Sequence, residues 1–182
     1  MPRLRYNAAT TLDGFIASPD GSTDWIIEDP AVNFNALYAE FDTFLMGRKT
    51  YEAMTHHAAQ SGVDALKDRN VVVVSREMKS ADHPAITIAA DGYLELVKEL
   101  KAGAGRDIWL MGGGQLAKAC LDAGLLDTVE VAVMPVIIGD GIKMIASASA
   151  EGNYPWKLEL RNVDALESGI LMCKHDVMKI QT

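Results

Sequence analysis

The sequence predicts an α/β fold: a mixed, mostly parallel sheet flanked by helices, with an antiparallel hairpin at its C-terminal end. Strand-like and helix-like segments alternate through the first two thirds of the chain, which is typical of parallel sheets. The last third contains strand patterns only, and such a tail adds antiparallel strands to one edge. In two places an expected strand runs through a glycine corner directly into a helix.

Size and composition limit the range of functions. The chain has 182 residues, 49% of them hydrophobic, which suits a single domain over residues 1–182. The formal net charge of -8 argues against a nucleic-acid or anionic-membrane partner. The two cysteines, Cys120 and Cys173, form no disulfide framework, and neither a signal-peptide core nor a membrane-spanning run is visible. We therefore expect a cytoplasmic protein with reduced thiols.

The first forty residues are expected to contain one strand and one helix. Residues 4–10 lean apolar and form the strand, whereas residues 11–25 have the Asp-Gly turn signals of a loop. The oxygens of that loop lack the closing glutamate of a calcium site, so no metal is expected there. Pro30 precedes residues 31–40, whose apolar side chains recur at helical spacing and predict a helix.

The next segment repeats the strand–helix alternation. Residues 41–46 form an apolar strand that ends in Gly47, and a helix is expected from residue 51 to about residue 57. Four consecutive valines make residues 70–76 the strongest strand pattern in the chain. Gly47, which lies between the strand of residues 41–46 and the helix that follows it, forms the first of the two glycine corners.

The remaining elements complete the sheet. Residues 85–89 form a short strand, and residues 91–101 form an amphipathic helix that a glycine ends. Residues 127–138 are a long β-branched strand interrupted by a proline. Residues 156–166 and 170–178 alternate in polarity and join through a Glu-Ser-Gly turn, as in a β-hairpin.

The clearest functional pattern lies in residues 107–125. An apolar run indicates a buried strand, three glycines follow, and a helical pattern begins at once. Such a corner aims free backbone N–H groups and the positive end of a helix dipole at an anion. Gly112, Gly113 and Gly114 leave room for a phosphate to approach, although a plain strand-to-helix turn also uses glycine.

Three such strand ends are expected to share one crevice, because ligands of open α/β sheets lie at the carboxyl ends of the strands. Besides the triple glycine, these are residues 47–50, which include Arg48, and the pair Ser75 and Arg76. Backbone amides at two corners suit a pyrophosphate, and two arginines with a hydroxyl suit a further phosphate. This combination favours NADP(H) over NAD(H), although neither GxGxxG nor GxxxxGK[ST] is present.

These motifs resemble the dihydrofolate reductase-like superfamily, in the branch of the reductase (C-terminal) domain of the bacterial riboflavin-biosynthesis deaminase/reductase. The matching segments follow the family's order over nearly the whole chain: residues 11–17, 45–52, 71–76, 107–116 and 135–141. The resemblance implies a dihydrofolate reductase-like fold and hydride transfer from NADPH to a small heterocyclic or carbonyl substrate. The implied activity is similar to that of 5-amino-6-(5-phosphoribosylamino)uracil reductase, often in a homodimer.

The resemblance also implies which residues bind the cofactor. Phosphate contacts are expected from Gly47, Arg48 and Thr50, and the adenosine 2′-phosphate is expected at Ser75 and Arg76. The pyrophosphate cradle would comprise Gly112, Gly113, Gly114, Gln115 and Leu116. The family often has a cis peptide between the first two of these glycines. The nicotinamide is expected to contact Ala9, Ile16 and Ala17.

The substrate side departs from the family pattern. The riboflavin branch has a lysine where this chain has Asn7 and an acidic residue where it has Met111. Folate reductases carry a carboxylate early in the first helix, whereas residues 31–40 offer Asn33 and Asn35 and no acid before Glu40. The candidates for substrate contact are Asn7, Asp13, Trp25 and Asn33. Asp13 is the catalytic candidate because its loop lies near the expected nicotinamide; the alternative is a turn residue of an Asp-Gly pair.

Two functional hypotheses follow. The first is an NADPH-dependent reductase, and the second is a non-catalytic NADP(H)-binding protein of the same fold, which the missing lysine and acids suggest. NADPH oxidation across a panel of acceptors separates them. No metal is expected in either case, since His56 and His57 lack a third ligand and have the character of exposed helix-end residues.

Overall fold

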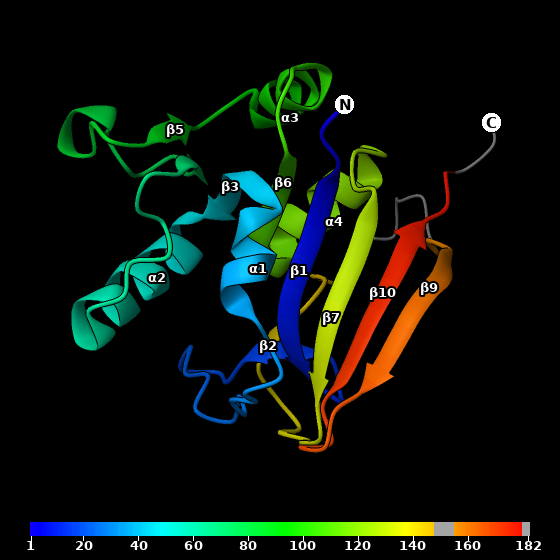
Figure 1. The fold of residues 1–182 in the computed structure, drawn as a ribbon. Coiled ribbons are helices and arrows are strands. Elements are labelled where there is room, and N and C mark those ends of the chain that lie inside the picture. The colour runs from blue at the N-terminus through cyan, green and yellow to red at the C-terminus, as the bar shows by residue number, and fades with distance from the viewer. Residues whose placement is uncertain (148–154, 180–182) are drawn as a thin grey trace.

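The computed structural model describes residues 1–147 and 155–179 (Figure 1). The strands of its main sheet are β1 (Leu4–Thr11), β3 (Phe41–Gly47), β4 (Asn70–Val74), β5 (Thr87–Ala89), β6 (Asp107–Gly112), β7 (Thr128–Met134), β9 (Leu158–Ala165) and β10 (Leu171–Val177). Their order is β5-β4-β3-β6-β1-β7-β10-β9. Neighbouring strands from β5 to β7 are parallel, whereas β10 runs antiparallel to β7 and to β9. The predicted mixed sheet with a C-terminal antiparallel hairpin is confirmed.

Helices cover both faces of this sheet. They are α1 (Phe34–Ala39), α2 (Arg48–Ser61), α3 (Tyr93–Ala102) and α4 (Gly114–Asp122), with a short 3-10 helix, η1, over Ser80–Asp82. Side chains of α3 and α4 pack on the face that carries Leu4 and Tyr6 of β1. Side chains of α1 and α2 join the cluster on the other face, around Phe44 and Trp109. No helix in the described part of the chain is long and apolar enough to cross a membrane.

The central strands are apolar throughout because both of their faces are covered. Phe44, Leu45 and Met46 of β3 are all fully buried, although successive side chains of a strand point to opposite faces. Each large apolar side chain buried in this way contributes about 1.5–3 kcal/mol to folding. This continuous burial explains why strands β3, β4 and β6 were visible in the sequence as uninterrupted apolar runs.

The boundaries of two helices differ from the prediction. The first helix is confined to Phe34–Ala39, because the side chain of Asn33 accepts a hydrogen bond from the Ala36 N–H and caps the helix there, three residues after Pro30. The second helix begins at Arg48 and continues to Ser61, well beyond His57. It ends where Gly62 adopts a left-handed conformation with φ 73°.

A small second sheet was missed. Within residues 11–25, expected to be a loop, β2 (Phe15–Ala17) pairs with β8 (Ile142–Lys143) in an antiparallel arrangement. The two strands are three and two residues long, so neither shows a periodic pattern. The long strand also ends earlier than predicted, at Met134, since Pro135 has no N–H group to continue the ladder.

Candidate cofactor site at the carboxyl edge of the sheet

The sheet register brings the three predicted corners to one edge, the carboxyl edge toward which the arrowhead of β7 points in Figure 1. Met46 is paired with Gly112, so the bend after β3 lies beside the bend after β6. Gly47 is paired with Val74, which places Ser75 next to the same bend. The expectation that these strand ends share one edge is therefore met by the parallel pairing of β4, β3 and β6.

The two glycine bends are in contact. A Cβ atom added to Gly47 would lie 3.9 Å from the backbone nitrogen of Gly113 and 4.0 Å from the carbonyl oxygen of Gly112. A Cβ atom at Gly112 would lie 3.6 Å from Oγ1 of Thr50 and 4.0 Å from Cδ1 of Ile16. The peptide bond between Gly112 and Gly113 is cis, as the resemblance implied. Residues from β2, β3, α2 and β6 thus surround one small region.

Two helices begin at this region with free amide groups. Gly47 caps α2 and Gly113 caps α4, and neither helix has a side-chain capping hydrogen bond. The first N–H groups of an α-helix have no partner within the helix. No atom lies within 4 Å of a Cβ placed on Gly113, so the space beside its Cα is open. The edge therefore has the unpaired donors and the helix-dipole ends that bind phosphate groups.

Gly114 has a different role from the two glycines before it. A Cβ atom at this position would lie 2.3 Å from the carbonyl oxygen of Lys143 and 2.9 Å from that of Met144. The Ala146 N–H also donates a 3.1 Å hydrogen bond to the carbonyl oxygen of Gly114. The close approach of residues 143–146 accounts for this glycine without any ligand.

The segment that crowds Gly114 also holds the expected nicotinamide loop. The Met144 N–H donates to the carbonyl oxygen of Gly14 at 2.9 Å, and the Leu12 N–H donates to that of Val136 at 2.9 Å. Ile16 and Ala17 lie in β2, which is paired with β8. Residues 136–146 therefore connect the start of α4 to the loop after β1. Sequence reasoning missed this connection; its signal was the Gly-Asp-Gly run after the long strand.

Arg48 and Arg76 both lie at this edge but differ in their surroundings. Nη1 of Arg48 is 2.8 Å from Glu52 and Nη2 is 3.1 Å from Glu77. The hydrogen bond to Glu52 raises the pKa of this guanidinium above its usual value. Arg76 is 82% exposed, and its Nε lies 3.6 Å from Asp91. Arg48 is thus already positioned by carboxylates, whereas Arg76 is free to reorient toward a ligand.

The other predicted cofactor residues are close by. The Ser75 hydroxyl oxygen accepts hydrogen bonds from the Glu77 and Met78 N–H groups, both 3.1 Å long, and its own proton remains available to a ligand. Gln115 is exposed at the start of α4, and the side chain of Leu116 is buried in the core below it. Leu116 therefore offers its backbone amide to this edge.

The predicted substrate residues lie in different parts of the chain: one in β1, one at the start of α1 and two in the segments on either side of β2. Asn7 and Ala9 lie on the β1 face that α1 covers, and the Asn7 carbonyl oxygen accepts a 2.9 Å hydrogen bond from the Trp109 indole. Asn33 caps α1. Trp25 is half-buried, and among the residues that the structure describes its indole N–H has no partner. Of these candidates, the structure gives Asn33 a structural role, and within residues 1–147 and 155–179 the side chain of Asn7 has no hydrogen-bond partner.

Asp13 holds the loop that follows β7. Its carboxylate accepts a 2.8 Å hydrogen bond from the Gly139 N–H and a longer one, 3.4 Å, from the Ile138 N–H. The Thr11 hydroxyl, followed by these backbone donors, lowers the pKa of the Asp13 carboxyl. The side chain is therefore ionised at neutral pH, a state that suits a loop anchor better than a proton donor.

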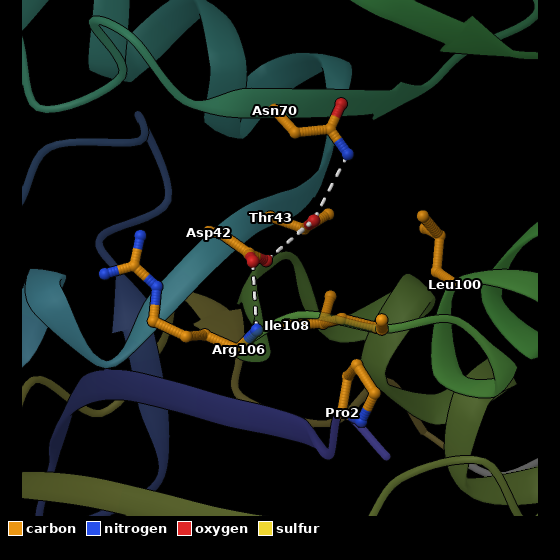
Figure 2. A pocket seen from close by; sticks show the side chains of 8 residues that line it. Pro2, Asp42, Thr43, Asn70, Leu100, Arg106 and Ile108 are labelled. Carbon is orange, nitrogen blue, oxygen red and sulfur yellow. Dashed lines mark hydrogen bonds between the residues drawn. The ribbon is translucent and has the colours of Figure 1, made fainter.

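A cavity lies at the opposite edge of the sheet. It has a volume of about 330 Å³ and is lined by residues such as Asp42, Thr43, Asn70 and Arg106 (Figure 2). The Asp42 carboxylate accepts from the Arg106 N–H at 2.9 Å, and the Asn70 amide donates to the Thr43 hydroxyl at 3.2 Å. These polar groups bind one another at the amino ends of the strands, away from the glycine bends.

Metal ligands are not gathered in the described ranges: no group of three or more His, Cys, Asp or Glu side chains there is arranged to hold an ion. His56 and His57 are exposed on α2. The groups that the described residues bring to the glycine edge include backbone amides, two arginines and a hydroxyl.

Comparison with known proteins identifies the class and the family. The sheet order and the touching glycine bends belong to the dihydrofolate reductase-like class of α/β proteins. Within that class the chain belongs to the RibD C-terminal domain family, whose model matches residues 2–172. It is homologous to the reductase domain of RibD, which supports an enzyme of the reductase type.

Individual relatives agree with this assignment. The uncharacterized protein YyaP of Bacillus subtilis is 32% identical over 177 residues, covering 93% of this chain and 92% of YyaP. The 2,5-diamino-6-ribosylamino-4(3H)-pyrimidinone 5′-phosphate reductase of Methanothermobacter thermautotrophicus is 28% identical, covering 76% of this chain and 80% of that protein. The crystal structure of a riboflavin biosynthesis protein from Shewanella sp. PV-4 has a TM-score of 0.79 at 19% identity, covering 97% of this chain and 99% of that one.

Proposed function

We propose that this protein is an NADPH-dependent reductase that transfers a hydride to a small polar heterocycle. The observation that supports it is the contact between the Gly47 and Gly113 bends, which places two helix N-termini and Arg48 around one region. A ligand with several separated phosphates matches this arrangement. The membership in the RibD C-terminal domain family supports the same conclusion.

Each part of the site has a role in holding the cofactor. The open amides at the starts of α2 and α4 would bind the pyrophosphate, since each supplies unpaired N–H donors. Arg48, Ser75 and Arg76 would bind the 2′-phosphate, because guanidinium groups pair with phosphate in a two-pronged geometry. Ile16, whose side chain borders Gly112, would lie against the nicotinamide ring.

Hydride transfer is the chemistry that NADP(H) supplies when bound. The protein's own residues orient the two reactants and exclude water from the region between them. Residues 136–146 fix the loop that carries Ile16 and Ala17, and Asp13 fixes residues 138 and 139 in turn. We assign Asp13 to positioning, and we propose that solvent water supplies the proton that the acceptor requires.

Replacing Arg76 tests the choice of cofactor. The change Arg76→Ala is expected to weaken NADPH binding by about 1.5–3 kcal/mol, the usual value of hydrogen bonds to charged groups, and to leave NADH binding unchanged. Titration calorimetry with both cofactors measures this difference. Equal losses for NADPH and NADH would mean that Arg76 does not contact the 2′-phosphate.

The alternative, a non-catalytic NADP(H)-binding protein, is supported by Asn7 and Met111, which stand where the riboflavin branch has a lysine and an acidic residue, and by the absence of an acid before Glu40 in residues 31–40. Loss of NADPH absorbance with pterins, pyrimidines and carbonyl compounds distinguishes the two functions. Turnover of any of these acceptors would exclude the alternative. Tight NADPH binding with no turnover across the panel would favour it.

We further propose that two chains pair through the C-terminal hairpin. Leu158, Leu160 and Val163 of β9 are about half exposed, and the register places them on the same sheet face as Val129 and Val131 of β7. This aliphatic surface extends the buried core past the helices, as in many dimer interfaces. Light scattering is expected to show a dimer for the wild type and a monomer for Leu160→Lys. A wild-type monomer at all concentrations would contradict the pairing.

A further inference from the structure

A second cavity, of about 180 Å³, lies beside the expected nicotinamide residues. It opens on the sheet face that carries Asn7, and both Asn7 and Leu37 of α1 line it. Ala132, which also lines it, is the register partner of Ala9. The cavity therefore includes one predicted substrate residue, Asn7, and the strand neighbour of one expected nicotinamide residue, Ala9, and it extends from there toward β10 and β9. Its volume suits a single substituted ring.

The two cations in this cavity are already neutralised. Nε and Nη2 of Arg5 bind the two carboxylate oxygens of Glu130, each at 2.7 Å, and Nη1 binds Glu40 and Asp107. Arg5 is only 5% exposed, so water does not compete with these ion pairs. Nζ of Lys174 lies 3.3 Å from Glu130. Both cations therefore pair with the same carboxylate, Glu130, and Arg5 is held by two further carboxylates.

The remaining polar groups are mostly acceptors. Glu40, Glu130 and Asp164 line the cavity against only two cations, Arg5 and Lys174, which leaves one negative charge in excess. One carboxylate oxygen of Asp164 accepts a 2.6 Å hydrogen bond from Asn162, and its other oxygen has no partner in the described part of the chain. The side chain of Asn7 is likewise unpaired there. A ligand that brings N–H donors would replace water on these acceptors, whereas a phosphate would meet a lining with one excess negative charge.

We propose that this cavity binds the acceptor as an amino-substituted ring, neutral or cationic, that carries no phosphate. The proposal rests on the reductase function proposed above and specifies its substrate class. Asp164 accepts a hydrogen bond from an exocyclic amino group, and Asn7 pairs with the ring edge nearer the nicotinamide. The substrate thereby differs from the 5′-phosphate named for the Methanothermobacter relative.

Binding of matched pyrimidine compounds tests the proposal. Titration calorimetry is carried out with cytidine, uridine and cytidine 5′-monophosphate, in saturating NADP⁺ so that the nucleotide cannot occupy the cofactor phosphate site. Cytidine is expected to bind about tenfold more tightly than cytidine 5′-monophosphate and than uridine, since one charge-assisted hydrogen bond corresponds to roughly that ratio. Tighter binding of the monophosphate, equal binding of all three, or no saturable binding of any would overturn the proposal.

Substitution of Asp164 tests the assignment within the cavity. Asp164 is exposed on β9, so Asp164→Asn is expected to fold normally and to reduce the preference for cytidine over its monophosphate by about fivefold or more. The matched control is Glu99→Gln, an exposed carboxylate on α3, which packs on the opposite face of the sheet. A preference that Asp164→Asn leaves unchanged would show that this carboxylate does not bind the ring.

The outcomes for the cofactor and for the ring are separable. NADPH affinity is measured on the same samples before the pyrimidines are added. If NADPH binds and cytidine is not preferred, the cavity proposal fails while the reductase proposal stands. If NADPH does not bind and cytidine is preferred in its absence, the reductase proposal fails and the cavity still discriminates amino-substituted rings.

Discussion

Replacing Gly47 with alanine separates cofactor binding from folding at the glycine edge. Gly47 has φ -81° and ψ 164°, which alanine adopts without strain. The added methyl group would lie 3.9 Å and 4.0 Å from its nearest neighbours, at ordinary van der Waals distance. Alanine is a poorer helix cap than glycine, but it gains about 0.4–1 kcal/mol because the unfolded chain has less freedom. We expect the free energy of unfolding to change by about 0.5 kcal/mol or less.

NADPH affinity, in contrast, is expected to fall. The new methyl group projects into the region between the first amides of α2 and α4, where the pyrophosphate is proposed to bind. A phosphate held away from these amides loses at least one charge-assisted hydrogen bond, which is worth about 1.5–3 kcal/mol. The dissociation constant for NADPH should therefore rise between about tenfold and about 150-fold.

Titration calorimetry measures the NADPH affinity, and urea denaturation measures the stability of the same variant. Gly103→Ala is the matched control, because Gly103 has φ -73°, follows α3 and tolerates a Cβ 3.4 Å from the Leu100 carbonyl oxygen. That variant should bind NADPH like the wild type. A folded Gly47→Ala protein with wild-type NADPH affinity would refute the assignment of this edge to the cofactor.

Two further predictions concern carboxylates. Asp13→Asn should lower stability slightly through a weaker hydrogen bond to Gly139 and leave the pH profile of kcat unchanged; a lost limb of that profile would make Asp13 the proton donor after all. Burial alone would raise the pKa of Glu130, but its hydrogen bonds to Arg5 and the charge of Arg5 lower it below the usual 4.5. Glu130 therefore contributes stability that is fully present above pH 4.5 and is lost as the pH falls through its folded-state pKa. Thermal unfolding of the wild type should show this acid limb, and Glu130→Gln should flatten it; identical limbs would mean that Glu130 is not linked to folding.

The main elements were predictable because their causes are local. Four consecutive valines at residues 71–74 and the apolar run before Gly112 indicate buried strands, whatever the rest of the chain does. The predicted helix at residues 91–101 was nearly right, since its apolar periodicity and the glycine at its end are both visible in sequence. The first helix was overextended because the cap at Asn33 depends on backbone geometry rather than on composition.

The roles of individual site residues were less predictable. Gly113 and Gly114 are neighbours of the same type, yet the space beside Gly113 is open and Gly114 faces the Lys143 carbonyl oxygen at 2.3 Å from its potential Cβ. Asp13 was a catalytic candidate by position, and its contact with Gly139 depends on a loop 126 residues further along the chain. The Gly-Asp-Gly run at residues 139–141 marks a turn, but no local pattern shows which distant segments that turn and the following residues contact.

The amino-acid sequence by itself determined the alternation of strands and helices, the antiparallel tail and the glycine corners, because each depends on residues within a few positions of one another. The tertiary structure decided which of those corners touch, which glycine is open to a ligand, and that Arg5 is neutralised by Glu130 in a cavity that extends to β9. These properties arise from contacts between segments far apart in the chain, whose positions are set only when the sheet is assembled.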